Sequence, residues 1–192
     1  MHAPRVNRRD LLLGLAALAA AAGARGQPRP HAAPPGSTRC LVEIILFRQP
    51  GPPPAAVPAG PLPQIGTIAG RVEKLPDTEW QLGMLEAGLR RRSGFQVLAH
   101  TAWAAIVPPN GRTTAQLEEL LPPGTGLAGT VSLQRSQYLF LGVDVDFVAP
   151  DGPTYGLRER RRIKFNERHY FDSPALGVIA EVRPGRGAAA ID

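Results

Sequence analysis

Basic side chains fall on alternate positions near the C-terminal end of the chain, at Arg158, Arg160, Arg162 and Lys164. Successive side chains of a β-strand point to opposite faces, so a strand here would carry these groups on one face. Guanidinium groups bind carboxylates through paired hydrogen bonds. The pattern therefore predicts a cationic surface for an acidic ligand. A solvated outer face with internal ion pairs has the same pattern, and both interpretations stay open.

The hairpin that precedes this segment determines which residues face it. A three-residue loop with Gly152 in the left-handed conformation places Phe147 opposite Tyr155 and Val145 opposite Leu157 on the inner face. A two-residue loop would instead mix buried and exposed residues. With the longer loop, the outer pairs are Asp144 with Arg158, Phe140 with Arg162, and Tyr138 with Lys164. The predicted outer face thus has one ion pair and two contacts between a cation and an aromatic ring.

The same register conflicts with a buried inner face at one place. Glu159 and Arg161 fall opposite Val143 and Leu141. Because charged groups are costly to bury, we expect a bulge, or the open end of the sheet, at this point.

Glu167, His169 and Asp172 lie close together farther along the chain. Two ligands from one segment make a poor metal site, and a hydrogen-bonded turn before Ser173-Pro174 accounts for the same residues. We therefore expect no catalytic residue, metal or cofactor. An envelope hydrolase that uses Glu167, His169 or Asp172 is an alternative. His100 has no second histidine nearby, so it is expected to be structural.

The N-terminal residues predict export. Arg8 and Arg9 precede a run of leucine and alanine that ends in Ala22-Gly23-Ala24, so residues 1–24 are assigned to a signal peptide. Its apolar core is too short to span a bilayer. The paired arginines suit either a Tat-like or a Sec signal. The full chain has a net charge of +6, and cleavage after Ala24 removes three of its 22 basic and one of its 16 acidic residues, which leaves 19 minus 15, or +4. In a periplasmic location, this basic charge favours acidic wall polymers, lipid phosphates or an acidic protein over nucleic acid.

Composition divides the rest of the chain. Residues 25–38 are rich in Pro, Gly and Ala, which predicts a flexible tether. A single domain is expected at 39–184, with a proline-rich loop at 49–75, and a loose tail at 185–192. Cys40 is the only cysteine, so an internal disulfide is excluded, and we expect it to be a small buried residue that opens a strand.

Hydrophobic patterns predict the elements of this domain. Residues 40–47 are apolar in both phases apart from Glu43, which predicts a central strand covered on both faces. A helix should begin at the capping pair Thr78 and Gln81 and end before Gly94. The residues of its apolar face are Leu82, Leu85 and Leu89.

The remaining elements are mainly strands. One strand is predicted at 95–101, with its end at Trp103, and a short helix at 114–121 behind the capping pair Thr113 and Gln116. An antiparallel meander begins at Leu127, and a last strand covers 177–183. The fold class is a single α+β domain, a mainly antiparallel β-sheet with one principal helix packed on one face. The order of elements is compatible with a ferredoxin-like arrangement.

Four stretches of the domain resemble a known family. They are V-E-I-I-L-F-R at 42–48, S-G-F-Q-V-L-A-H-T-A-W at 93–103, L-A-G-T-V-S-L-Q-R-S-Q-Y-L-F-L at 127–141, and R-R-I-K with H-Y-F-D-S-P-A-L-G-V-I within 161–179. These stretches are similar to the CsiV family of periplasmic peptidoglycan-binding proteins. The chain departs from the family pattern at two places. It has Phe140 where the family favours a histidine, and Ala104-Ala105-Ile106 where the family has Arg-Gln-Pro.

The resemblance implies a non-catalytic module that binds peptidoglycan and supports a class A penicillin-binding protein, together with a lipoprotein activator in the best-studied case. The expected function is therefore that of a periplasmic adaptor in cell-wall synthesis. The residues expected to bind the ligand or partner are Arg158, Arg160, Arg162, Lys164, Tyr138, Phe140, His169 and Tyr170. A structural envelope module that docks an acidic partner protein is the alternative.

Overall fold

The computed structural model describes residues 33–51, 72–150 and 152–186. The predicted signal peptide lies outside the described residues, as do most of the predicted tether and proline-rich loop and the end of the predicted tail. Within the described residues, no helix is long and apolar enough to cross a membrane. These residues are mainly antiparallel β-structure with one principal helix, as predicted.

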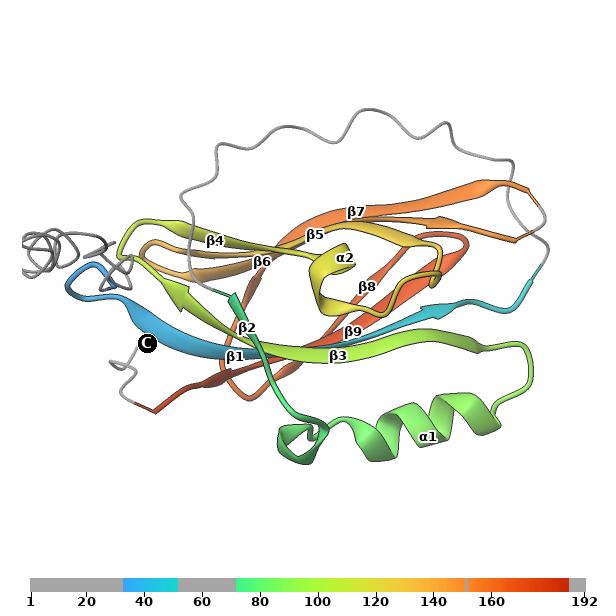
Figure 1. The fold of residues 1–192 in the computed structure, drawn as a ribbon, viewed down its shortest axis with the longest axis horizontal. Helices are drawn as coiled ribbons and strands as arrows, with labels where there is room; N and C mark the ends of the chain where they lie inside the picture. The colour runs from blue at the N-terminus through green and yellow to red at the C-terminus, as the bar shows by residue number, and fades with distance from the viewer. Residues whose placement is uncertain (1–32, 52–71, 151, 187–192) are drawn as a thin grey trace, which may run out of the picture. The chain divides into compact units, whose positions relative to one another are not determined.

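The elements form two sheets with antiparallel neighbours (Figure 1). The first sheet has the order β2-β3-β1-β9-β8 and the second the order β4-β5-β6-β7. In chain order the elements are β1 (Thr38–Arg48), β2 (Val72–Lys74), a 3₁₀ turn (Asp77–Glu79), α1 (Gly83–Arg91), β3 (Gln96–Val107), β4 (Arg112–Gln116), α2 (Leu117–Leu120), β5 (Leu127–Arg135), β6 (Leu139–Val148), β7 (Thr154–Ile163), β8 (Arg168–Asp172) and β9 (Leu176–Pro184).

The sequence predicted one sheet, which was wrong, because the strands form two separate sheets. The ferredoxin-like arrangement is not confirmed. A helix that crosses over between two strands of one sheet normally joins parallel strands. Here β1 and β3, which flank α1 in the sequence, pair directly with each other and run antiparallel.

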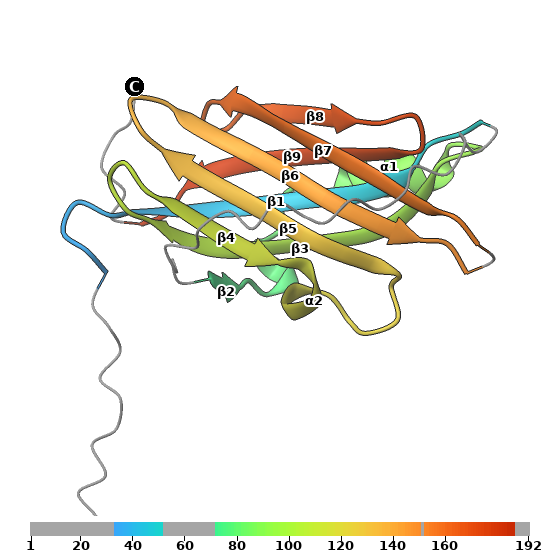
Figure 2. The ribbon, with the colours of Figure 1, turned by 90° about the horizontal axis from the view of Figure 1, so that it is seen from above.

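The two sheets pack face to face around one apolar core. Ile44 on β1 and Trp103 on β3 contribute from the first sheet, and Leu141 on β6 and Leu157 on β7 contribute from the second. In Figure 2 the strands of the second sheet cross over those of the first. Burial of this apolar area is the main source of stability. The opposite face of each sheet points away from this core.

The far faces of the two sheets differ. On the first sheet, Leu82 and Leu89 at the start and end of α1 pack with Ile45 and Phe47 of β1, so β1 is buried on both faces as predicted. On the second sheet, the inward residues are buried except for the half-buried Arg135, Glu159 and Arg161, whereas the outward residues are half-buried or exposed. This difference explains why residues 40–47 are apolar in both phases apart from Glu43, and why apolar and polar residues alternate in the meander.

The start of α1 differs from the prediction. The helix begins at Gly83, and the predicted cap Thr78 lies in the preceding 3₁₀ turn and makes no capping hydrogen bond. The carboxylate of Glu43 on β1 instead accepts hydrogen bonds from the backbone amides of Gln81 and Leu82, at 2.7–2.9 Å. A side chain from another element therefore takes the place of the local cap.

The predicted helix at 114–121 was largely wrong. Residues 112–116 form β4, which pairs with β5, and only Leu117–Leu120 are helical. Thr113 and Ala115 of β4 are buried, and the Thr113 hydroxyl donates to the Ile106 carbonyl instead of capping a helix. Likewise β3 continues to Val107, so Trp103 is a buried core residue inside the strand rather than its end. In both segments, core packing overrides the local signals.

Candidate functional site

The hairpin of β6 and β7 has the predicted register. Phe147 pairs with Tyr155, and Asp144 with Arg158. The pairing continues without interruption, so the predicted bulge is absent, and β7 is instead the edge strand of its sheet. This edge corresponds to the alternative prediction of an open end.

At this edge, the two inward charges opposite Val143 and Leu141 compensate each other. The side chains of Glu159 and Arg161 form an ion pair, and the Arg161 guanidinium lies 4.8 Å from the ring centroid of Phe171. Both charged residues are half-buried. A local ion pair at the edge of the core is thus present at the place where the sequence predicted a β-bulge.

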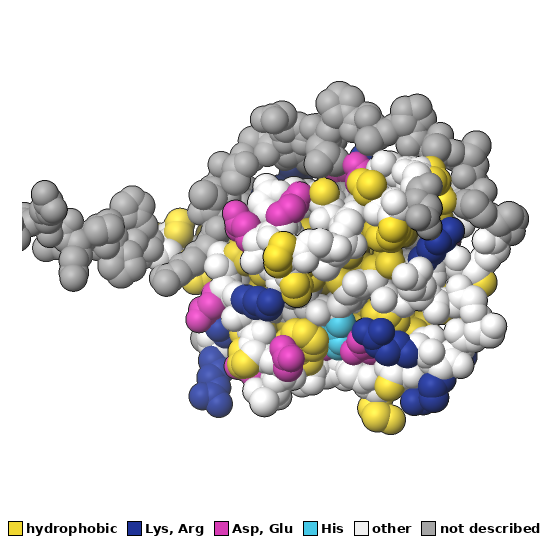
Figure 3. Space-filling model, turned by 45° about the vertical axis from the view of Figure 1, so that its right-hand side comes forward, with side chains coloured by type: hydrophobic (Ala, Val, Ile, Leu, Met, Phe, Trp, Pro, Cys, Tyr) yellow, Lys and Arg dark blue, Asp and Glu magenta, His cyan; other side chains and the backbone are white. Residues whose placement is uncertain are grey.

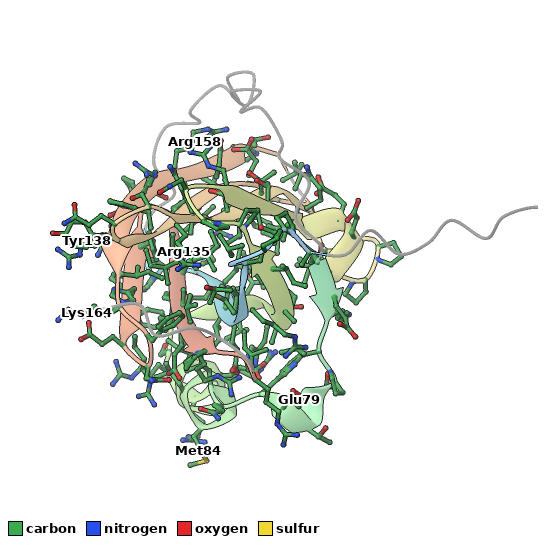
Figure 4. The ribbon with its side chains drawn as sticks, turned by 90° about the vertical axis from the view of Figure 1, so that its left-hand side faces the viewer. Glu79, Met84, Arg135, Tyr138, Arg158 and Lys164 are labelled. Atoms are coloured by element: carbon green, nitrogen blue, oxygen red, sulfur yellow. The ribbon has the colours of Figure 1, made fainter. Side chains whose placement is uncertain are left out.

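Arg158, Arg160 and Arg162 of β7 lie on the outer face of the second sheet, and Lys164 follows directly after the strand. We call this surface the cationic face, and it consists of Arg158, Arg160, Arg162, Lys164, Tyr138 and Phe140. All four basic residues are exposed. Figure 4 shows Tyr138, Arg158 and Lys164 at the periphery of the fold, away from Met84 on α1. In contrast, the face drawn in Figure 3 mixes acidic, basic and hydrophobic side chains.

The contacts between cations and rings are shifted from the predicted pairs. Phe140 pairs with Arg162 in the ladder, but the guanidinium over its ring is that of Arg160, at 4.3 Å from the centroid. Arg162 lies 3.4 Å from the centroid of Tyr138. Lys164 pairs instead with Glu167, at 3.6 Å. Long side chains on paired strands reach the diagonal neighbour as well as the direct one, so register alone does not identify the contact.

The arginines of the cationic face differ in how their charge is balanced. The Nε atom of Arg158 lies 3.1 Å from Asp144, and its Nη2 atom lies 2.9 Å from Asp146. Burial raises the pKa of Asp144, the charge of Arg158 opposes that rise, and the charge of Asp146 adds to it. Arg158 is therefore compensated inside the protein.

Arg160 and Arg162 have no ion-pair partner among the described residues. The amide oxygen of Gln134 accepts hydrogen bonds from Arg160 Nη2 and from Arg112 Nη2, each at 2.9 Å. This neutral oxygen orients two arginines without cancelling their charge. The middle of the cationic face therefore carries uncompensated positive charge.

The other predicted contact residues lie on β8. His169 Nε2 accepts a hydrogen bond from the Lys164 amide at 3.4 Å, so it lies near the end of the cationic face. Tyr170 stacks on Phe47 of β1, with ring centroids 6.2 Å apart, and thus packs beside the apolar residues between α1 and the first sheet instead. Among the described residues, no group of three or more His, Cys, Asp or Glu side chains is arranged to hold a metal ion.

A second charged cluster lies under α1, and the sequence did not reveal it. Glu43 is fully buried, and its Oε1 atom lies 2.9 Å from His100 Nε2. The other ring nitrogen of His100 lies 2.8 Å from Glu86 of α1, and Arg183 Nη2 of β9 lies 3.3 Å from Glu43 Oε2. We call these four residues the Glu43 cluster. The only sequence signal was an acidic residue within an apolar strand.

Within the Glu43 cluster, the Glu43 carboxylate and both ring nitrogens of His100 have hydrogen-bond partners, whereas the Nε atom of Arg183 is buried without one among the described residues. Burial alone would lower the pKa of His100, but hydrogen bonds to Glu43 and Glu86 raise it overall. Burial would raise the pKa of Glu43, and hydrogen bonds from His100 and the backbone amides lower it overall. Ionised carboxylates only accept hydrogen bonds, so the two contacts favour a protonated His100 that donates from both nitrogens. His100 is thus structural, as predicted, and the cluster ties α1 to the first sheet.

Comparison with curated proteins and with solved structures finds no match for this chain. A family model described as peptidoglycan-binding protein, CsiV, matches residues 16–185. The matched span contains both sheets, α1, the cationic face and the Glu43 cluster. The chain therefore belongs to the CsiV family of peptidoglycan-binding proteins.

Proposed function

We propose that this protein binds peptidoglycan through the cationic face. The observation that carries the proposal is the state of Arg160 and Arg162, which are exposed, lie over aromatic rings and have no ion-pair partner among the described residues. Their charge is available to the carboxylates that peptidoglycan carries on its peptide stems. Family membership supports the same ligand.

The protein acts as a non-catalytic adaptor in the periplasm. It holds the wall with the cationic face and supports a class A penicillin-binding protein, in some systems together with a lipoprotein activator. The resemblance to CsiV proteins and the signal-like N-terminal sequence support this role. An acidic partner protein docking on the cationic face is the second candidate, because uncompensated arginines recognise carboxylates on a protein equally well.

Co-sedimentation with intact peptidoglycan sacculi tests the proposal. The protein, residues 25–192, should pellet with sacculi at low salt and be released as salt rises, because the binding is ionic. Arg158→Gln, Arg160→Gln and Arg162→Gln together should reduce pelleting and leave the melting temperature nearly unchanged. A protein that stays in the supernatant at low salt contradicts the proposal and directs attention to a protein partner.

A matched triple variant controls for net charge. Lys74, Arg91 and Arg92 are exposed basic residues on β2, at the end of α1 and just after it. Changing all three to Gln alters the total charge by the same amount as the test variant. Equal losses of pelleting in the two triple variants would show that overall charge, rather than the cationic face, drives binding. Capture of an envelope protein that is insensitive to added peptidoglycan would favour the second candidate.

A further inference from the structure

The aromatic rings of the cationic face are already in contact with cations. Arg160 lies 4.3 Å from the ring centroid of Phe140, and Arg162 lies 3.4 Å from that of Tyr138. A sugar that stacks on an aromatic ring needs an uncovered ring face, and each of these rings has one face taken. The contacts hold the guanidinium groups in place, which reduces the rotamer entropy that they lose on binding. Guanidinium groups that are held in place and lack an ion-pair partner favour an anionic ligand group.

A gap in the side-chain layer lies beside Arg160. Gly142 on β6 pairs with Ser132 on β5 and with Arg160 on β7. A Cβ atom at Gly142 would lie 2.7 Å from Ser132 Oγ and 3.9 Å from Arg160 Cβ. Since glycine has no such atom, the Ser132 hydroxyl and the stem of Arg160 border the same space. The missing side chain of Gly142 thus leaves room for the Ser132 hydroxyl beside Arg160, where it can donate a hydrogen bond to a ligand group that binds the arginine.

Positive charge dominates around this gap. Arg112 and Arg160 both bind the neutral amide of Gln134, and one nitrogen of Arg112 is buried without a hydrogen-bond partner among the described residues. The nearest acidic side chain on the same strand face, Asp144, lies within ion-pair distance of Arg158. A ligand group at the gap therefore meets two arginines whose charge no described carboxylate offsets.

We infer, on the basis of the proposed peptidoglycan binding, that this patch is a subsite for a carboxylate of the peptide stems rather than for the glycan sugars. The residues of the carboxylate subsite are Arg112, Ser132, Gly142, Arg160 and Arg162. Arg160 donates charge-assisted hydrogen bonds and Ser132 donates from its hydroxyl, while Arg162, which lies over Tyr138, adds positive charge at the edge of the subsite. Arg112 positions Arg160 through their shared contact with Gln134.

Sacculi with amidated stem carboxylates separate the two kinds of ligand group. Amidation removes the negative charge of the stems and leaves the sugars unchanged. The dissociation constant should rise by about tenfold or more on amidated sacculi, since a charge-assisted pair is lost. Equal binding to treated and untreated sacculi would overturn the carboxylate subsite and leave the proposed function intact. Failure to bind either preparation would instead overturn the proposed function.

Two single variants locate the subsite within the cationic face. Arg160→Gln should weaken binding to untreated sacculi by about tenfold and remove most of the difference between untreated and amidated sacculi. Arg158→Gln makes the same charge change on the same strand but removes a compensated arginine, so its effect should stay within about twofold. Equal losses in the two variants would overturn the assignment. Thermal melting curves confirm that both variants are folded.

A double variant and a lipid control complete the test. Ser132→Ala with Gly142→Ala removes the hydroxyl and fills the gap, and it should weaken binding to untreated sacculi by about threefold or more with Arg160 and Arg162 intact. Unchanged binding would overturn the role of the gap. Vesicles that contain phosphatidylglycerol should show no loss of binding with Arg160→Gln. The same sensitivity on vesicles as on sacculi would overturn the peptide-stem assignment in favour of a lipid phosphate.

Discussion

The cationic face and the Glu43 cluster use the same kinds of side chain in opposite ways. In the cluster, His100 and Arg183 face the carboxylates of Glu43 and Glu86 within or at the edge of the core. On the cationic face, Arg160 and Arg162 meet rings and an amide but no described carboxylate. Charges that are satisfied inside the protein stabilise the fold, whereas charges left without a partner at the surface remain available for a ligand.

Substitution of Glu43 should have the largest effect, and this effect should be confined to the free energy of unfolding. Glu43→Gln leaves His100, Arg183 and two backbone amides without their ionised partner. We expect the free energy of unfolding to fall by about 3 kcal/mol, measured by chemical denaturation. The folded fraction should bind sacculi as the wild type does.

Glu73→Gln is the matched control for this change. Glu73 is an exposed residue of β2, so the same substitution there should alter the free energy of unfolding by no more than about 0.5 kcal/mol. Similar stability of the two variants would mean that the Glu43 cluster does not hold α1 to the first sheet.

Loss of the two uncompensated arginines should instead weaken binding and leave stability nearly unchanged. Arg160→Gln with Arg162→Gln should weaken binding to sacculi by about tenfold or more, equivalent to about 1.4 kcal/mol, and change the free energy of unfolding by about 0.5 kcal/mol or less. Co-sedimentation and chemical denaturation measure the two quantities on the same sample. A large loss of stability here would remove the distinction between the two regions.

The pH dependence of stability should report on the Glu43 cluster. Burial favours a lower pKa for His100, yet the contacts with Glu43 and Glu86 outweigh burial and raise this pKa above its ordinary value of 6.5. The folded state then holds this proton more tightly than the unfolded state, so the stabilisation is fully present below pH 6.5 and is lost as the pH rises through the folded-state pKa. We expect the free energy of unfolding to decline as the pH rises from 6.5 into the mildly alkaline range.

The carboxylates of the cluster limit stability on the acid side. Hydrogen bonds outweigh burial and lower the pKa of Glu43 and of Glu86 below the ordinary value of 4.5, so their contribution is present above pH 4.5 and is lost as the pH falls further. Chemical denaturation across pH 4–9 measures both limbs. In His100→Gln the decline above pH 6.5 should disappear. An unchanged profile in this variant would show that another group causes the decline.

The smallest effect on binding is expected from substitution of Phe140, whose ring contacts the Arg160 guanidinium. Phe140→Leu keeps an apolar side chain and removes the contact between the cation and the ring. Binding to sacculi should weaken by about two- to threefold, in line with about 0.5 kcal/mol for an exposed contact of this kind. Val148→Leu, on the same strand and exposed, should leave the affinity unchanged. An equal effect of both substitutions would argue against positioning by the ring.

Much of the second sheet was predictable because its faces differ. Inward and outward residues of β5, β6 and β7 alternate, and the loop at Gly152 then determines the register of the hairpin. The paired positions of Asp144 and Arg158 followed from that register. The diagonal contact of Arg160 with Phe140 did not, because a register specifies opposite backbone positions and not the rotamers of long side chains.

By itself, the sequence determined the elements whose signal is local and periodic: a central strand apolar on both faces, the alternating meander and the apolar stripe of the helix. Tertiary structure alone decided the division into two sheets, the replacement of the Thr78 cap by Glu43, and the contact of Arg112 and Arg160 with the same Gln134 oxygen. Each of these depends on groups far apart in the chain, and their free energy of interaction exists only when the fold brings them together.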